Sequence, residues 1–341
     1  MIKTAAAVSG TASCDRATEA SVLITARDVE AAAAQITPHV LRTPTVTSPG
    51  LTELLGAPVT TKLELLQRTG SFKSRGATAK LLSLSDEERA AGVVAVSGGN
   101  HGIATAVMAG ALGIDATVVM PRTAPRRAVE TAEAAGAHVV LADTMDGAFA
   151  LVDELRTKGL TLVHPFDDPV VIAAQGTVGL ELAEDAGELT DIVVSIGGGG
   201  LISGVATALK ARRPDIRIWG VETEGAQAMT AALAAGAPVP VRLTSIVTTL
   251  SAPSASPLTY EHVSTLVTDV LTVTDAEAVQ GTLDLAEHAK LWTEPAAGCV
   301  LPAARQVLNR IGKDAKLGLI ICGGNATTTD VHSWADQFGL T

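Results

Sequence analysis

Short aliphatic runs alternate with alanine-rich helical patterns along most of this chain, and this alternation constrains the fold more than any other feature. The runs show no exchange of apolar and polar residues, which is typical of parallel strands that helices cover on both faces. They lie at 93–96, 117–120, 139–141, 160–163, 192–196, 216–221 and 317–322. The helical patterns include roughly 102–112, 126–135, 146–157, 201–212 and 275–290. The sequence therefore predicts an α/β fold.

Composition allows a large core and excludes several classes of function. Of 341 residues, 47% are hydrophobic and 18% are charged, which suits two folded domains and not a disordered chain. The net charge of −11 argues against a nucleic-acid partner, because such a partner normally requires a basic face. No run of about 20 apolar residues is present, so we expect no membrane span. The three cysteines lack disulfide-framework or zinc-ligand spacing, and we expect a reducing cytoplasm.

The N-terminal region divides into two parts. Residues 1–20 are small and polar without periodicity, and we expect a flexible tail there. An amphipathic helix follows, with Thr25 as its expected N-cap and Pro38 near its end.

Ligands of open α/β sheets bind beyond the carboxyl ends of the strands, and three strand-to-helix turns are suited to this. The first, 197–200, contains four glycines, which let the backbone approach a ligand and point N–H groups into one concavity. At a helix N-terminus that concavity suits a phosphate, although a tight turn without a ligand is the alternative. The sequence has no GxGxxG and no GxxxxGK[ST], which weakens dinucleotide and P-loop interpretations.

The other two turns are 97–102 and 322–325. The first offers a hydroxyl, an amide and free N–H groups at a helix N-terminus, which suit a carboxylate. His101 by itself is more typical of a structural histidine than of an acid or base. Cys322 by itself is typical of a buried apolar cysteine.

Lys73 lies among small and apolar neighbours in the segment TGSFKSRGA (69–77). Partial desolvation there would lower its pKa and favour Schiff-base formation. Most lysines are solvated, so a surface lysine remains the more common interpretation of this residue alone.

Together these segments resemble the threonine/serine dehydratase (ammonia-lyase) family, the fold-type II pyridoxal-phosphate enzymes that are related to serine racemase. The resemblance runs from about residue 43 to residue 325 and follows the family order. Its motifs are LELLQRTGSFKSRGA (63–77), SGGNHG (97–102), HPFDDP (164–169), AAQGTVGLE (173–181), SIGGGGLISG (195–204), GVETEGA (220–226), EPAAG (294–298) and ICGGN (321–325).

The resemblance implies two open, twisted, mostly parallel sheets flanked by helices, a tryptophan synthase β-like architecture. The cofactor would lie between a large domain formed by 21–91 and 167–341 and a small mobile domain formed by 92–166.

The resemblance also implies roles for matching residues. Lys73 would form the Schiff base with pyridoxal 5'-phosphate and then move the Cα proton. The other residues implied to bind the cofactor are Phe72 and Asn100 at its ring, Gly197, Gly198, Gly199, Gly200 and Leu201 at its phosphate, and Cys322 at its pyridine nitrogen. The substrate carboxylate would be held by Ser97, Gly98, Gly99, Asn100 and His101.

The implied reaction is elimination of water from a small β-hydroxy L-amino acid, which gives a 2-keto acid and ammonia. A neutral thiol at Cys322 keeps the pyridine less protonated than a carboxylate would, and this favours loss of a β-substituent. Racemisation or β-replacement on the same scaffold is the alternative, but Gly98 stands where serine racemase has its second proton donor. A cofactor-binding protein without turnover is a third hypothesis.

The sequence differs from the family pattern at the cation site and at residues 248 and 249. The family's cation site is matched by Glu222 and Ala226 but has Ala228 in third place, so we expect no tight metal, with a weak or monovalent cation site as the alternative. Thr248 and Thr249 replace an Asp-Gly pair of the family, and a polar stretch follows at 251–257. Either this region faces the substrate, which would then not be plain threonine, or 251–257 is an exposed loop without catalytic meaning. The family implies a homodimer, and the end of the chain soon after 325 suggests a catabolic enzyme without a regulatory domain.

Overall fold

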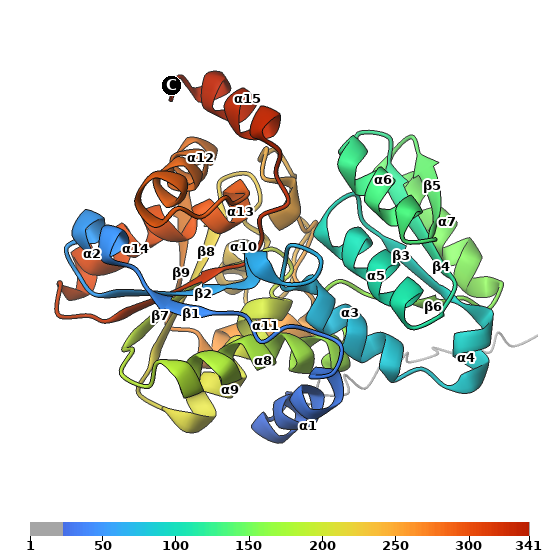
Figure 1. Ribbon diagram of the computed structural model, residues 1–341, viewed down its shortest axis with the longest axis horizontal. Coiled ribbons are helices and arrows are strands. Elements are labelled where there is room, and N and C mark those ends of the chain that lie inside the picture. The colour runs from blue at the N-terminus through green and yellow to red at the C-terminus, as the bar shows by residue number, and fades with distance from the viewer. Residues whose placement is uncertain (1–22, 341) are drawn as a thin grey trace, which may run out of the picture.

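The computed structural model describes residues 23–340, which fold into two lobes, each built on an open sheet (Figure 1). The expected tail at 1–20 lies outside the described residues. Every strand pair in both sheets is parallel except one at an edge, and helices flank both sheets. The predicted α/β fold with two mostly parallel sheets is therefore confirmed.

The larger sheet has six strands in the order β1-β2-β10-β7-β8-β9. Their bounds are Thr45–Thr47 (β1), Val59–Leu63 (β2), Leu317–Ile321 (β10), Asp191–Ser195 (β7), Arg217–Thr223 (β8) and Asp269–Val273 (β9). Strands β1, β2 and β9 were not predicted. β2 reads VTTKL, and its polar residues obscure a strand that is nonetheless buried at every position. β1 is short and pairs antiparallel with β2 at the sheet edge.

The smaller sheet has four parallel strands in the order β5-β4-β3-β6. Their bounds are Val93–Val96 (β3), Ala116–Pro121 (β4), His138–Ala142 (β5) and Thr161–Leu162 (β6). This lobe also holds α5 (Asn100–Ala111), α6 (Arg126–Ala134) and α7 (Met145–Thr157). All four strands were predicted, because each is an aliphatic run.

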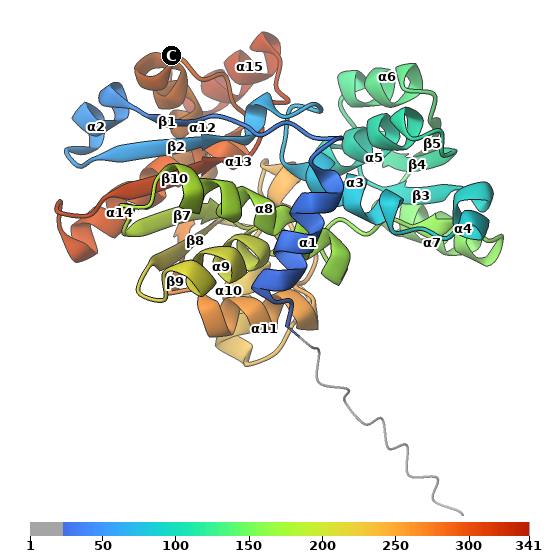
Figure 2. The ribbon, with the colours of Figure 1, turned by 60° about the horizontal axis from the view of Figure 1, so that its bottom comes forward.

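Helices cover both faces of the six-stranded sheet (Figure 2). One face carries α1 (Ala26–Ile36), α8 (Pro169–Asp185), α9 (Gly200–Arg212) and α11 (Pro257–Leu266). The other carries α2 (Pro49–Leu55), α12 (Asp275–Asp284), α13 (Pro295–Gly298) and α14 (Val300–Ile311). Three further α-helices are α4 (Asp86–Ala91), α10 (Ala228–Ala235) and α15 (Thr328–Phe338). Thr25 caps α1 as predicted.

Helix α3 (Lys73–Leu82) packs against both α5 and α8, so it joins the two lobes. It starts beside the carboxyl end of the larger sheet and runs toward the smaller one (Figure 1). The residue that begins this helix is therefore held where the two lobes meet.

The helix predicted over 275–290 is not a single α-helix. It is α-helical only as α12, and it continues as a π-helix over Leu285–Ala289 before Lys290 takes a left-handed backbone with φ of 61°. The N–H of Leu291 bonds the carbonyl of Leu285, which closes this wider turn. Side-chain periodicity does not distinguish an α-helix from a short π-helical extension, because both place apolar residues on one face.

Candidate active site

The segment before α3 is pinned to the turn that follows β10. Ser71 and Gly323 form an isolated antiparallel bridge, the N–H of Phe72 donates to the carbonyl of Cys322 at 3.1 Å, and the N–H of Gly324 donates to Gly70 at 2.9 Å. These bonds bring two of the sequence motifs together across about 250 residues of chain. They place Lys73 next to Cys322.

Lys73 is the first residue of α3, and the residue as a whole is half-buried between the lobes. Its Nζ donates to the carbonyl of Pro165 at 2.9 Å and lies 5.1 Å from the centre of the Phe72 ring. Burial lowers the pKa of Lys73 from 10.5 to about 8, against the opposing effect of Cys322. A larger share of this amine is therefore neutral, and nucleophilic, than in a solvated lysine.

A buried ion network holds α3 in place. The Arg75 guanidinium donates to Glu64 Oε1 at 2.7 Å and to Glu181 Oε1 at 2.6 Å, and Lys62 Nζ lies 2.6 Å from Glu181 Oε2. Arg75, Glu64 and Lys62 are fully buried. Two cations and two carboxylates balance, and removal of any one would leave a buried charge without its partner. The network thus fixes the first turn of α3, from which the Lys73 side chain extends.

The turn 197–200, called here the glycine turn, leads from β7 into α9. Gly199 has φ of 92°, a left-handed backbone that favours glycine. A Cβ on Gly198 would overlap the Phe166 ring, and one on Gly197 would lie 3.1 Å from the carbonyl oxygen of Leu250. The first N–H groups of α9 have no partner within the helix, so they can bond an anion at its N-terminus. This backbone fits a phosphate group.

The turn 97–100, called here the asparagine turn, leads from β3 into α5. Ser97 Oγ accepts the N–H of Gly99 at 3.1 Å, so this hydroxyl serves its own turn. Position 98 packs against the Ala124 segment, where a Cβ would lie 2.9 Å from Ala124 Cβ. The backbone N–H groups at the start of α5 are the donors that remain for a carboxylate.

The side chain of His101 is directed away from the asparagine turn. Its Nε2 lies 2.8 Å from the carbonyl oxygen of Val163, and the residue is buried. Burial, and then the charge of Lys73, lower the pKa of His101 to about 3, so the imidazole is neutral. Only the backbone of His101 is therefore available to a carboxylate.

Asn100 contacts two side chains that the sequence did not single out. Its Nδ2 donates to Glu294 Oε1 at 2.6 Å, and its Oδ1 accepts from Asn325 Nδ2 at 2.7 Å. Both partners belong to the six-stranded lobe, whereas Asn100 begins α5 of the four-stranded lobe. Glu294 and Asn325 occur in the motifs EPAAG and ICGGN, and those motifs were the only sequence signal for them.

Cys322 is the last of the predicted site residues. It is buried, and burial raises the pKa of its thiol well above the ordinary value, so the thiol is neutral. Cys299 lies near it, donating to Ser195 Oγ at 3.4 Å, and burial raises the pKa of Cys299 to about 12. A neutral thiol can share a hydrogen bond with a ring nitrogen but cannot stabilise a positive charge there as a carboxylate would.

The residues described fit pyridoxal phosphate in three respects: a partly neutral lysine, a glycine turn at a helix N-terminus, and buried polar groups between them. The Ser71 hydroxyl is also buried without a partner beside Gly323. The chain matches the family described as "Pyridoxal-phosphate dependent enzyme" over residues 36–323. It belongs to this family.

Similar proteins of the pyridoxal-phosphate family cover nearly all of the chain. The L-threonine ammonia-lyase of Thermotoga maritima is 40% identical over 89% of this chain and 76% of that protein. The catabolic L-threonine dehydratase TdcB of Staphylococcus aureus (strain USA300) is 37% identical over 91% of both chains. Among solved structures, maize serine racemase has a TM-score of 0.86 at 34% identity, covering 93% of this chain and 98% of that one. A threonine deaminase from T.th. has a TM-score of 0.82 at 36% identity, covering 89% and 99%.

Within this family member, segment 248–250 lies against both turns. The Thr249 methyl carbon is 3.3 Å from where a Cβ on Gly99 would lie, and Leu250 adjoins Gly197. Asp275 anchors the preceding residues by accepting from Ser245 Oγ at 2.5 Å and from the N–H of Ile246 at 2.9 Å. Thr248 and Thr249 are exposed and Leu250 is buried, so both interpretations of this segment stay open.

The candidate cation site is occupied by protein donors. Glu222 Oε1 accepts the N–H of Met229 at 2.8 Å, and Oε2 accepts the N–H and hydroxyl of Thr230 at 2.8 and 2.7 Å. The carboxylate thus caps α10. Between residues 23 and 340, no group of three His, Cys, Asp or Glu side chains could hold a metal ion. Ala226 contributes at most a carbonyl.

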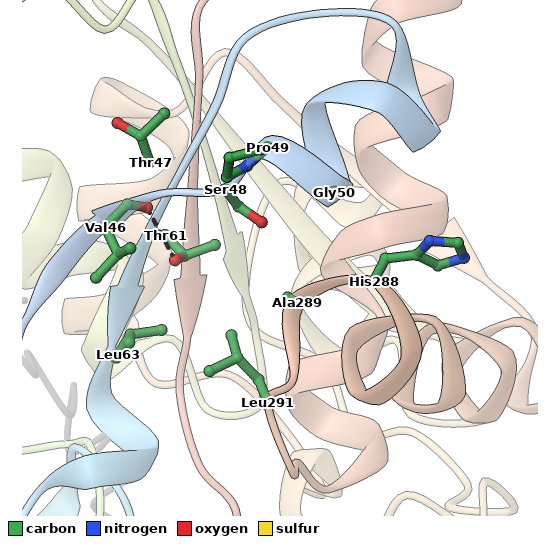
Figure 3. A pocket seen from close by; sticks show the side chains of 10 residues that line it. All are labelled: Val46, Thr47, Ser48, Pro49, Gly50, Thr61, Leu63, His288, Ala289 and Leu291. Carbon is green, nitrogen blue, oxygen red and sulfur yellow. Dashed lines mark hydrogen bonds between the residues drawn. The ribbon is translucent and has the colours of Figure 1, made fainter.

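The structure also contains a cavity that lies apart from the glycine turn and the asparagine turn. A cavity of about 180 Å³ lies beside edge strand β1, and no predicted site residue lines it. Figure 3 shows the side chains that line this cavity. Its lining residues are Val46, Thr47, Ser48, Pro49, Gly50, Thr61, Leu63, His288, Ala289 and Leu291. Among the described residues, no helix is both long and apolar enough to cross a membrane.

Proposed function

We propose that this enzyme eliminates water from a small β-hydroxy L-amino acid of the threonine or serine type. The released enamine is then hydrolysed by water to a 2-keto acid and ammonia. The observation that carries the proposal is the position of Lys73, a lysine of lowered pKa between the asparagine turn and the glycine turn. The threonine ammonia-lyases and dehydratases at 37–40% identity support the same reaction.

We propose the following residues as the cofactor site. Lys73 would bond the cofactor covalently, Phe72 would pack beside its ring, and Asn100 would donate to its phenolic oxygen. The glycine turn and Leu201 hold its phosphate with backbone N–H groups. Cys322 contacts its pyridine nitrogen as a neutral thiol.

In this arrangement each protein group has a defined task. Bound pyridoxal phosphate supplies an electron sink for the bonds at Cα of the amino acid. The Lys73 amine removes the Cα proton, which its lowered pKa allows near neutral pH. The N–H groups at the start of α5 hold the substrate carboxylate and fix its orientation, which reduces the entropy lost on reaching the reactive geometry. Thr249 borders the same space.

Racemisation is the second candidate, because maize serine racemase and an aspartate racemase are among the similar structures. Inversion at Cα requires a proton donor on the face opposite Lys73. Position 98 is glycine and is closely packed against Ala124, so no side chain supplies that donor there. Serine in deuterated water separates the two reactions. Elimination yields pyruvate and ammonia, whereas release of deuterated D-serine without pyruvate would contradict our proposal.

A panel of 3-hydroxy amino acids, scored by keto-acid release, tests the proposed reaction and its substrate range. Threonine and serine are expected to be used. Failure to release ammonia from any of them, with cofactor bound, would instead support a binding protein without turnover. The absorbance band of lysine-bound cofactor, and its loss in Lys73→Ala, tests the attachment separately.

We also propose that the enzyme is a cytoplasmic homodimer and that residues 92–166 move as a small domain against 21–91 and 167–341. The buried free thiols of Cys299 and Cys322 support a reducing compartment. The division of the strands between two sheets supports the domain boundary. Sedimentation analysis would test the dimer.

A further inference from the structure

Glu294 is a buried acid to which the proposed reaction assigns no task. It immediately precedes α13, yet its side chain makes no capping bond with that helix. Instead its carboxylate points to Asn100, with 2.6 Å between Oε1 and Nδ2. The residue is only 4% exposed, and no ion pair among the described residues includes it. Burial of a carboxylate that neither caps its helix nor pairs with a cation costs free energy. The hydrogen bond from Asn100 is the main interaction that offsets this cost.

The orientation of the Asn100 amide follows from its neighbours. The carbonyl of Thr69 can only accept, and it lies 2.8 Å from Asn325 Nδ2. Asn325 therefore uses one N–H for Thr69 and the other for Asn100 Oδ1, at 2.7 Å. This leaves the Asn100 NH₂ group facing Glu294, which accepts. One of its two N–H groups is bonded to Glu294, and none of the residues from 23 to 340 accepts the second, which is left for a ligand.

The space around the Glu294 carboxylate is shaped by a glycine. A Cβ on Gly323 would lie 2.6 Å from Glu294 Oε1 and 3.2 Å from Asn100 Nδ2. Any side chain at this position would separate the two groups. The cluster thus combines the end of β10, the start of α13 and the start of α5, which are contributed by both lobes.

We propose that Glu294 is a positioning residue that holds the Asn100 amide across the boundary between the lobes and directs its second N–H to the bound cofactor. This inference rests on the proposed function, because the second N–H of Asn100 has no other assigned ligand. Glu294 itself touches neither cofactor nor substrate in this scheme and acts through Asn100.

The bond between Glu294 and Asn100 changes strength in the neutral pH range. Burial raises the pKa of Glu294 from 4.5 to about 7, against the effect of Asn100. Cys322, the titratable group that faces it, is neutral there because burial raises its pKa. When Glu294 is ionised, the bond is charge-assisted and about twice as strong as a neutral one. When Glu294 is protonated, the Asn100 amide is held less firmly.

The test compares wild type with Glu294→Gln and with Asn325→Ala as the matched control. Glutamine keeps the shape and a neutral acceptor but cannot ionise. Asn325→Ala removes the other bond to Asn100 and leaves the titrating acid in place. We expect kcat of Glu294→Gln to fall about tenfold at pH 8 with KM changed less than about twofold. The absorbance band of bound cofactor should shift between about pH 6 and pH 8 in wild type and in Asn325→Ala but not in Glu294→Gln.

A measurement without cofactor isolates the titration of Glu294. An acid whose folded-state pKa is raised stabilises the fold most below its ordinary value of 4.5, and this contribution is lost as pH rises to about 7. The thermal midpoint of cofactor-free Glu294→Gln should therefore exceed that of wild type at pH 8 and match it at pH 4.

Three outcomes are decisive. A pH-dependent band that persists in Glu294→Gln, or an unchanged kcat in that variant, overturns the positioning role while leaving the proposed reaction intact. Loss of the band in wild type itself, with no keto acid formed, overturns the proposed function instead. Loss of the pH shift in Glu294→Gln alone supports the inference.

Discussion

The glycine turn and the asparagine turn both lead from a parallel strand into a helix, yet they are built differently. The glycine turn depends on absent side chains, because Phe166 and Leu250 fill the places that Cβ atoms would take. The asparagine turn depends on side-chain bonds, since the Asn100 amide is held by residues of the other lobe. A turn of the first kind tolerates no enlargement, whereas one of the second kind tolerates no loss of a distant partner.

Lys73 lies between the two turns, and its removal should have the largest effect. In Lys73→Ala both turns remain, so the protein should fold and still retain cofactor without a covalent bond. We expect keto-acid release to fall by about a thousandfold or more, because the base and the covalent attachment are both lost. Lys80→Ala, in the same helix, is the control and should keep most activity. A Lys73→Ala enzyme with near-normal turnover would disprove the assignment.

Enlarging the glycine turn should have the next largest effect. Gly198→Ala places a methyl group against the Phe166 ring, and overpacking of this kind costs about 2 kcal/mol. The dissociation constant for pyridoxal phosphate, measured by fluorescence, should rise about thirtyfold. Gly187→Ala is the control, because Ala183 is its nearest neighbour at 3.8 Å. Equal affinity in both variants would show that the glycine turn does not hold the phosphate.

A change beside the asparagine turn should alter specificity more than rate. Thr249→Gly removes the methyl group that lies against Gly99 and so opens space beside the expected position of the substrate. We expect the ratio of kcat/KM for threonine over serine to change about tenfold, the usual effect of one methyl-sized volume. If the ratio is unchanged, segment 248–250 does not face the substrate.

The smallest effect concerns loading of the cofactor onto Lys73. Imine formation needs the neutral amine, and the pKa of Lys73 is lowered to about 8 by burial. The rate of covalent attachment, followed by absorbance, should rise about fivefold from pH 7 to pH 8 and level off above that range. A rate that keeps rising toward pH 10 would mean that the amine has the pKa of a solvated lysine.

The strands and helices were largely predictable, and the exceptions have a common cause. Runs rich in aliphatic residues marked all four strands of the smaller sheet, because helices flank this sheet and most of its strand positions are apolar. β2 escaped prediction because Lys62 and two threonines lie in it. In the structure Lys62 is buried and compensated by Glu181, a partner 119 residues away. Local hydropathy cannot represent such a pairing.

The same limit applies to the site. Lys73 and the glycine turn were predicted as cofactor-binding from residue type, spacing and family resemblance. The predicted contacts of Ser97 and His101 with a carboxylate stay predictions, and they are limited to backbone N–H groups because the two side chains bond Gly99 and Val163. Glu294 and Asn325 were seen only as parts of motifs.

By itself, the sequence determined the parallel α/β class and the glycine turn, because both depend on residues that are close together along the chain. The tertiary structure alone decided what surrounds Asn100. Its partners Glu294 and Asn325 lie 194 and 225 residues away and come from the other lobe. Burial between the lobes is also what lowers the pKa of Lys73 and raises that of Glu294. Desolvation depends on the packing of distant segments, which no local pattern specifies.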